Sequence, residues 1–201
     1  MGSSDRAARG RAILPHSMRA PHFLAPVVVA VVAATSLSAC SHKPPLGWAE
    51  GGARLVFARA VWTSGDEDPI EIGADGKVTS DGDVLFVIDG AGRVFDEDRE
   101  AIAVLLPDGH LGGSDDTSLG RVGVTNASPP GRTTAWLSIL PDGNILFFDS
   151  EGERSSMGSW RGCQGPQLRT CTLVTHLVVL NRAIAESRSH VSVGVGIGVW
   201  R

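Results

Sequence analysis

Residues 54–150 predict a mainly β protein whose strands form an antiparallel meander. Asp-Gly pairs recur five times in this stretch, at 75–76, 81–82, 89–90, 108–109 and 142–143. Both residues tolerate the positive φ that a tight hairpin turn requires. Intervening runs such as 83–88 and 134–139 have the length and the β-branched and aromatic composition of strands. We therefore expect a single-layer or partly rolled sheet of short hairpins.

Two of these turns are near copies of each other. Residues 106–111 read Leu-Pro-Asp-Gly-His-Leu, and residues 140–145 read Leu-Pro-Asp-Gly-Asn-Ile. In each copy Pro presets the first turn angle, and Gly takes the left-handed exit of a type I turn that closes with a bulge. Gly109 and Gly143 are therefore predicted to have positive φ.

The second copy continues into a segment with a family resemblance. Residues 141–149, Pro-Asp-Gly-Asn-Ile-Leu-Phe-Phe-Asp, resemble a strand pair from a blade of the NHL-type β-propellers. A propeller needs at least four blades of roughly 40 residues each. The chain after Cys40 is too short for four blades once its C-terminal tail is set aside, so we expect one such hairpin and no propeller.

The C-terminal part of the chain has two different periodicities. Leucine and isoleucine recur at helical spacing over residues 173–184, which predicts an amphipathic helix. The valines in the same run leave a strand as the alternative. Val191, Val193, Val195, Ile197 and Val199 then alternate with Ser192 and three glycines. This strict alternation predicts a final paired strand with its aliphatic side chains facing the core.

The N-terminal part has the order of a secretory signal peptide, which is removed rather than folded. Arg19 precedes the apolar run 27–34, which is far shorter than the roughly 20 residues that a membrane span needs. Residues 37–40, Leu-Ser-Ala-Cys, resemble the lipobox of bacterial lipoproteins. The resemblance implies that residues 1–39 are removed and that Cys40 receives acyl chains, palmitate among them, and anchors the protein to a membrane. Met18 is the expected start of translation.

The lipoprotein resemblance also predicts the domain organisation and the location. Residues 40–53 are expected to form the lipidated cysteine and a short extended tether, and residues 54–201 a single β-rich extracytoplasmic domain. In Gram-negative lipoproteins Asp after the lipidated cysteine retains the protein in the inner membrane, whereas this chain has Ser41. The resemblance thus implies the cell envelope and, in a Gram-negative host, the periplasmic or surface face of the outer membrane.

The charge of the mature chain argues against a nucleic-acid partner. The four arginines and one aspartate before Cys40 leave residues 40–201 with a formal net charge of −7, against −4 for the whole chain. Phosphate binding needs a clustered positive surface, and the sequence shows none. The expected partners are the membrane, reached through Cys40, and an unidentified envelope protein or polymer.

Cys163 and Cys171 are the two cysteines that lipidation leaves over, and they have seven residues between them. In an oxidising compartment such a pair predicts a disulfide. As the alternative, residues 159–163, Ser-Trp-Arg-Gly-Cys, resemble the nucleophile segment of the L,D-transpeptidases, which modify peptidoglycan. The resemblance implies a Cys163 thiolate with His110 or His176 as its base. Gly165 stands where that family has Arg.

Metal ligands and an aromatic binding surface are two further hypotheses that the residue types raise. Cys163, Cys171, His176 and His190 could ligate zinc, although their spacing matches no familiar zinc pattern. Acidic clusters at 66–68, 81/83, 96–98 and 115–116 could bind calcium or could serve only to form turns. Five tryptophans, Trp48, Trp62, Trp136, Trp160 and Trp200, could line a binding surface or fill the core.

The sequence contains no complete catalytic constellation, and we predict no catalytic residues, no metal and no cofactor. The expected function is that of a lipid-anchored cell-envelope protein with a non-catalytic binding or structural role. The alternative is a peptidoglycan-modifying enzyme, similar to the L,D-transpeptidases, that uses Cys163 as its nucleophile.

Overall fold

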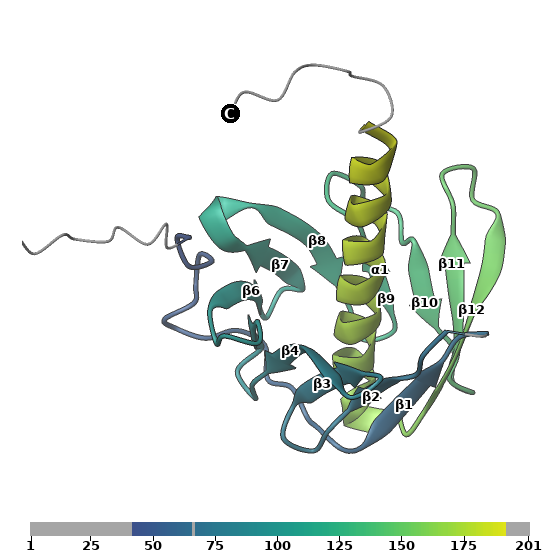
Figure 1. Cartoon of the computed structure of the whole chain (residues 1–201), viewed down its shortest axis with the longest axis horizontal. Coiled ribbons are helices and arrows are strands. Elements are labelled where there is room, and N and C mark those ends of the chain that lie inside the picture. The colour runs from purple at the N-terminus through teal and green to yellow at the C-terminus, as the bar shows by residue number, and fades with distance from the viewer. Residues whose placement is uncertain (1–41, 66, 192–201) are drawn as a thin grey trace, which may run out of the picture. The chain divides into compact units, whose positions relative to one another are not determined.

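The computed structural model describes residues 42–191 with the exception of residue 66, and these belong to one compact unit. The described residues form twelve strands, two 3-10 turns and one helix (Figure 1). The strands are β1 (Ala60–Thr63), β2 (Ile70–Ile72), β3 (Lys77–Ser80), β4 (Asp83–Ile88), β5 (Arg93–Phe95), β6 (Ala101–Leu105), β7 (His110–Gly113), β8 (Ser118–Val122), β9 (Asn126–Ser128), β10 (Leu137–Ile139), β11 (Asn144–Phe148) and β12 (Arg154–Arg161). The 3-10 turns are η1 (Ser114–Asp116) and η2 (Gly165–Gln167), and the helix is α1 (Leu168–Val191).

The strands form a closed antiparallel ring. Each strand pairs with its neighbours along the chain, and β1 pairs with β12, with Trp62 opposite Trp160. The predicted mainly β class, the meander and the C-terminal helix are confirmed. The expected single-layer or partly rolled sheet is wrong, because the meeting of β1 and β12 closes the sheet on itself.

A turn glycine recurs every 16 or 17 residues around part of this ring, at Gly76, Gly92 and Gly109, and again 34 residues later at Gly143. Each has positive φ, and its carbonyl accepts a hydrogen bond from a backbone amide at the end of the next hairpin. The residues four before and two after each glycine are fully buried aliphatic side chains: Ile72/Val78, Ile88/Val94, Leu105/Leu111 and Ile139/Ile145. The meander is thus built from a repeating unit about one hairpin long.

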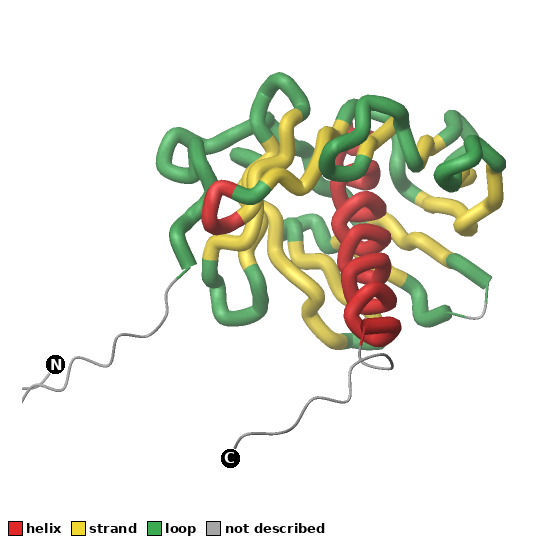
Figure 2. The backbone as a smooth tube through the Cα atoms, turned by 90° about the horizontal axis from the view of Figure 1, so that it is seen from above, coloured by secondary structure: helices red, strands yellow, loops and turns green. Residues whose placement is uncertain are grey.

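α1 passes through the middle of the ring, with strands on several sides of it (Figures 1 and 2). Every residue from Thr170 to His176 is 0% exposed, so this half of the helix has no solvent-facing side. From Asn181 onward the helix rises out of the ring, and most of residues 181–187 are exposed. The run 173–184 is therefore helical as predicted, but it is not an amphipathic helix lying on a sheet. Burial on all sides overrides the weaker helix preference of its valines.

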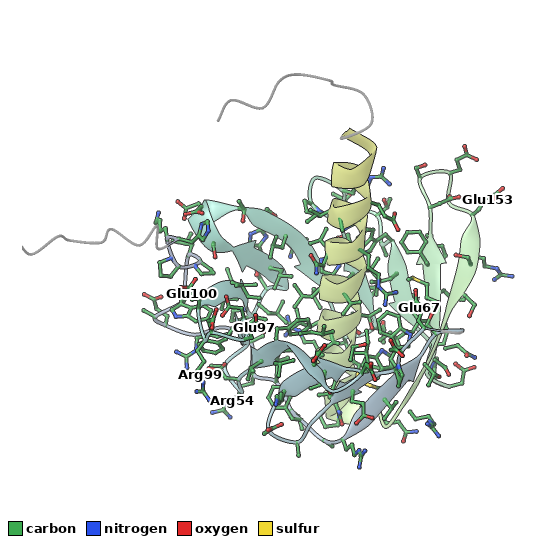
Figure 3. All side chains as sticks on the ribbon, in the orientation of Figure 1. Arg54, Glu67, Glu97, Arg99, Glu100 and Glu153 are labelled. Atoms are coloured by element: carbon green, nitrogen blue, oxygen red, sulfur yellow. A yellow bond between two sulfur atoms is a disulfide. The ribbon has the colours of Figure 1, made fainter. Side chains whose placement is uncertain are left out.

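Polar side chains fix the buried half of α1 to the surrounding ring. The hydroxyls of Thr170 and Thr172 donate to the carbonyls of Val56 and Val124, at 2.9 and 2.7 Å. Apolar side chains fill most of the space between helix and strands, and charged residues such as Glu153 lie at the periphery (Figure 3). Because each buried hydroxyl has a partner, these polar groups are tolerated inside the core.

The segment expected to be an extended tether is folded against the ring over its described part. The amides of Gly52 and Ala53 donate to the carbonyls of Ala91 and Leu105, both at 2.6 Å. Trp48 packs edge-on against Phe95, with ring centroids 4.9 Å apart. The ring domain therefore includes residues upstream of position 54. The predicted final strand, 191–199, lies almost wholly outside the described residues; Val191 is the last residue of α1.

The turn glycines generate a prediction about stability. Gly143 has φ +90°, and a Cβ built there would collide with the carbonyl oxygen of Trp160. Gly82 has nearly the same φ, +87°, with open space around it. Gly82→Ala should cost only the left-handed strain, about 1–2 kcal/mol, whereas Gly143→Ala should cost at least about 3 kcal/mol because neighbouring hairpins must separate. Urea unfolding of the two variants measures the difference, and equal losses would contradict this role of Gly143.

Candidate functional site

A groove runs beside the half of α1 that leaves the ring, and we call it the helix groove. Its volume is about 400 Å³. The residues lining it are mostly aliphatic or aromatic and come from α1 and five strands: Ile70 from β2; Ser80 from β3; Leu85 and Phe86 from β4; Ile102 and Ala103 from β6; Leu119 from β8; and Leu177, Val178, Leu180, Asn181, Arg182 and Ile184 from α1.

The helix groove exists because α1 continues beyond the ring that covers its first turns. Leu177, Leu180 and Ile184 follow one another at helical spacing; the first two are half-buried where the helix leaves the ring, and Ile184 lies beyond it. Ile184 is 41% exposed, and Leu85 of β4 is 39% exposed. Arg182, the only ionisable group in the lining, forms a 2.7 Å ion pair with Glu67. The groove therefore suits an apolar ligand or segment rather than acid–base chemistry.

A second, polar pocket of about 540 Å³ lies beside the turn at 106–109. Arg121 donates to the carbonyl of Asp108 at 2.7 Å, and Arg169 lies within 3.4 Å of the carbonyls of Leu106 and Pro107. The buried Nε of Arg169 has no hydrogen-bond partner among the described residues. The pKa of Asp108 is lowered, mainly by the amide of His110 and further by Arg121. This carboxylate reduces the positive charge that the two guanidinium groups bring to the pocket.

His176 is a buried structural residue in this fold. Its Nε2 lies 2.7 Å from the carbonyl of Leu119, so this nitrogen carries the proton. Its Nδ1 accepts a hydrogen bond from the indole Nε1 of Trp136 at 3.0 Å. Burial lowers the pKa of His176, because the charged imidazolium would lose its solvation. Both nitrogens of this candidate base are therefore occupied.

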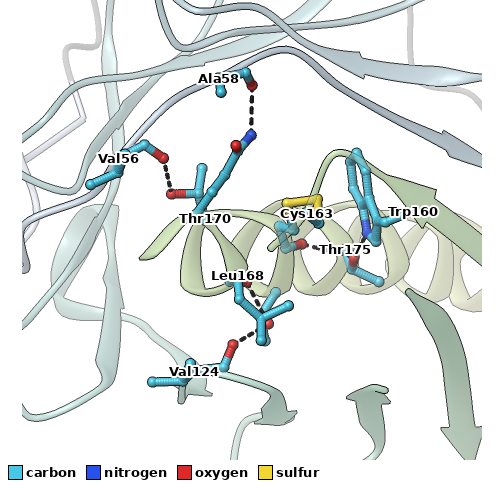
Figure 4. Close-up of a disulfide and its surroundings, with 11 residues drawn as sticks. Val56, Ala58, Val124, Trp160, Cys163, Leu168, Thr170 and Thr175 are labelled. Carbon is cyan, nitrogen blue, oxygen red and sulfur yellow. Dashed lines mark hydrogen bonds between the residues drawn. A yellow bond between two sulfur atoms is a disulfide. The ribbon is translucent and has the colours of Figure 1, made fainter. Parts of the chain in front are cut away.

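Cys163 and Cys171 lie at disulfide distance, with Cα atoms 6.1 Å apart (Figure 4). Cys163 follows β12 and Cys171 is in the first turn of α1, so the pair links the end of the ring to the start of the helix. Both residues are buried. A sulfur held in such a bond is neither a nucleophile nor a thiolate ligand for zinc. The nearby Trp160 Nε1 donates a hydrogen bond to the hydroxyl of Thr175 at 2.8 Å, which also links β12 to α1.

The acidic residues lie mainly in turns that they themselves stabilise. Asp96 accepts the amide of Glu100 at 2.7 Å, and Asp89 accepts the amides of Ala91 and Arg93. In the described part of the chain no three His, Cys, Asp or Glu residues gather where they could hold a metal ion. Asp96, a member of one of the predicted acidic clusters, therefore stabilises the turn in which it lies.

The described tryptophans do not share one exposed platform. Trp62 and Trp160 are buried in the core, with ring centroids 5.9 Å apart. Trp136 is half-buried against His176, and Trp48 lies against Phe95. Core packing is the correct interpretation for Trp62 and Trp160. Trp200 lies outside the described residues.

Residues next to the predicted lipidation site bind a loop of the ring. Cys40 itself lies outside the described residues. His42 Nδ1 is 2.8 Å from a carboxylate oxygen of Asp115, and Lys43 Nζ is 2.6 Å from Asp116. The Lys43 amide also donates to Asp115, while the Asp115 amide donates back to the Lys43 carbonyl. The hydrogen bond with Asp115 raises the pKa of His42 and lowers that of Asp115. We call this set of contacts the anchor clamp.

Comparison with protein-family models, curated proteins and solved structures finds no match for this chain. In the described part of the chain, no helix has both the length and the apolar composition needed to span a membrane.

Sequence reasoning did not identify the helix groove, the polar pocket or the anchor clamp. The groove combines Leu85 with Ile184, which are far apart in the chain, and the clamp combines residues 42–43 with 115–116. No local pattern links such positions. The apolar spacing of 177, 180 and 184 was visible, but only the ring shows that this stripe leaves the core.

The contacts of His176 predict a pH dependence of stability. The folded protein holds His176 neutral below the 6.5 of a free histidine. The unfolded chain therefore binds an additional proton as the pH falls below 6.5, and the free energy of unfolding should fall by up to about 1.4 kcal/mol per pH unit. His176→Gln should remove this slope, which the wild-type protein should show. Urea unfolding between pH 7.5 and 5.5 measures the slope. His42, whose pKa shifts the opposite way, is present in both proteins. An identical slope in both would show that His176 is not the source of the pH dependence.

The cysteine pair predicts the oxidation state of the protein. Alkylation under denaturing, non-reducing conditions should leave Cys163 and Cys171 unlabelled, and reduction before alkylation should label both. Peptide mass spectrometry distinguishes the two states. Labelling of both residues without reduction would restore the thiolate and zinc interpretations.

Proposed function

We propose that this chain is a lipid-anchored protein of the bacterial cell envelope with a non-catalytic binding role. Residues 37–40 carry the proposal, because Leu-Ser-Ala-Cys fills a lipobox directly after an apolar export segment. Several acyl chains on Cys40 would provide stable anchoring, since each buried methylene contributes about 0.8 kcal/mol.

The anchor clamp supports a defined position for the domain at the membrane. Lys43 is only three residues from Cys40, and its backbone and side chain both bind the η1 loop. With so few residues between lipid and clamp, the ring would stay within about 10–15 Å of its anchor rather than move on a long tether.

The helix groove supports a binding role. It presents a concave apolar surface containing two of the exposed large hydrophobic residues of the described chain, Leu85 and Ile184. A partner that covers them would remove apolar area from water. The enzymatic alternative requires a free Cys163 thiolate, which the alkylation experiment measures directly. In a Gram-negative host, Ser41 favours the outer membrane.

Lipidation of Cys40 is tested by membrane partition. The wild-type protein should sediment with the membrane fraction and carry the mass of its acyl chains. Cys40→Ala should lose both properties, or accumulate as an uncleaved precursor, because no thiol is present to receive lipid. Cys163→Ala is the matched control and should keep both the lipid mass and the membrane location. Unchanged mass and partition in Cys40→Ala would refute the proposal, whereas Ser41→Asp tests only the sorting between two membranes.

A further inference from the structure

The polar pocket beside the turn at 106–109 contains two guanidinium groups without a carboxylate partner among the described residues. Arg121 comes from β8 and Arg169 from the first turn of α1. Neither forms an ion pair with an Asp or Glu in the described part of the chain. A charged side chain that is partly withdrawn from water usually has an opposite charge beside it. The pocket therefore has cations whose natural partner is missing.

The guanidinium of Arg169 is also incompletely hydrogen-bonded. Its Nε is buried and has no partner among the described residues. Its Nη2 lies 3.4 Å from the carbonyls of Leu106 and Pro107, whereas a well-formed N–H···O bond is about 2.9–3.0 Å long. A charged donor group that is satisfied this poorly costs free energy. An anion in the pocket would supply both a closer acceptor and a counter-charge.

The hairpin repeat departs from its pattern beside this pocket. The turn glycines 76, 92, 109 and 143 leave position 126 as the missing member of the series, and Asn126 stands there. Thr125 precedes it, whereas Asp precedes the glycine in three of the four other turns. The amide of Gly123 donates to the carbonyl of Asn126, three residues on, rather than four residues on as after Leu106.

This shorter turn changes the charge of the pocket. Among the lining residues Asp108 is the one acidic group, and it comes from the regular turn on the other side. The two arginines therefore leave the lining with an excess of one positive charge. This excess is unusual in a chain whose residues 40–201 have a formal net charge of −7. A break in a repeat that creates such a charge points to a functional site.

We propose that the polar pocket binds a small hydrophilic ligand through a carboxylate or phosphate group. The planar fork of a guanidinium matches two oxygens of either group. Asn126, Ser128 and Thr133 add amide and hydroxyl groups to the lining, so the body of the ligand can be polar, as in an acidic sugar. The volume of about 540 Å³ is in the range of small-molecule sites. The pocket shares no lining residue with the helix groove, so the proposal is independent of the groove and of lipidation.

Isothermal titration calorimetry of the full chain at low salt tests the site with two anions and a neutral analogue. Glucuronate and inorganic phosphate are the anions, and methyl glucoside is the neutral sugar. At least one anion should bind with a Kd below about 10 mM, and methyl glucoside at least about tenfold more weakly. The anion that binds more tightly identifies the group that the pocket recognises. Binding of neither anion, or equal binding of methyl glucoside, would overturn the proposal.

Charge variants locate the binding in the pocket. Arg169→Gln should weaken binding of the tighter anion at least about tenfold, because a neutral amide replaces a charged donor. Arg154→Gln is the matched control: it removes the same charge from an exposed position on β12 and should leave the Kd unchanged. Equal losses of affinity in these two variants would overturn the proposal, because the anion would then respond only to overall charge.

A variant with improved binding guards against a loss that comes from misfolding. Asp108→Asn removes the carboxylate of the pocket, while its amide oxygen can still accept the hydrogen bond from the amide of His110. The affinity for the anion should rise at least about threefold, because the repulsion between two negative charges is lost. Circular dichroism should show the wild-type fold. Unchanged or weaker binding in Asp108→Asn would contradict an anion site at this position.

Discussion

The enclosure of the first turns of α1 is the constraint on which the rest of this structure depends. The strands are three to eight residues long, and a single short hairpin cannot bury enough apolar surface to be stable. Closing twelve such strands into a ring creates an inner apolar face that needs a filling. Residues 170–176 provide it, and the ring in turn buries every side of that helix segment. Ring and helix are therefore stable only together.

Polar contacts inside the ring determine how the helix sits. Apolar packing alone would allow α1 to rotate or slide, because valine and leucine are interchangeable at modest cost. Thr170, Thr172 and His176 each meet a carbonyl from a different part of the ring, and a displaced helix would leave these buried groups without partners. These contacts fix the depth of α1 in the ring and its rotation about its own axis. They therefore determine how much of α1 emerges to form the helix groove.

One hairpin connects the features that bear on function. The η1 loop between β7 and β8 carries Asp115 and Asp116 of the anchor clamp, and Leu119 of β8 both lines the helix groove and accepts the hydrogen bond of His176. Asp115 and Asp116 have φ of 56° and 58°, a left-handed geometry that aspartate tolerates better than most residues but at a higher cost than glycine. Their bonds to His42 and Lys43 help to offset that strain, so the segment next to the proposed anchor is part of the folded domain.

Local turn chemistry and periodicity were sufficient to predict the β class, the meander and the helical spacing near the C-terminus. The predicted strand-rich stretch, residues 54–150, stopped short of β12 (Arg154–Arg161), the strand that closes the ring. The pairing of Cys163 with Cys171 was likewise predictable, because the chain has three cysteines and the lipobox resemblance assigns Cys40 to lipid. The hairpin repeat is also present in the sequence, as glycines 76, 92, 109 and 143 with aliphatic residues at fixed offsets. The folded structure was needed to show that Trp62 meets Trp160 to close the ring, that α1 lies inside it, and that Leu85 and Ile184 share a groove. These contacts join distant residues through burial and shape complementarity, which leave no periodic trace along the chain.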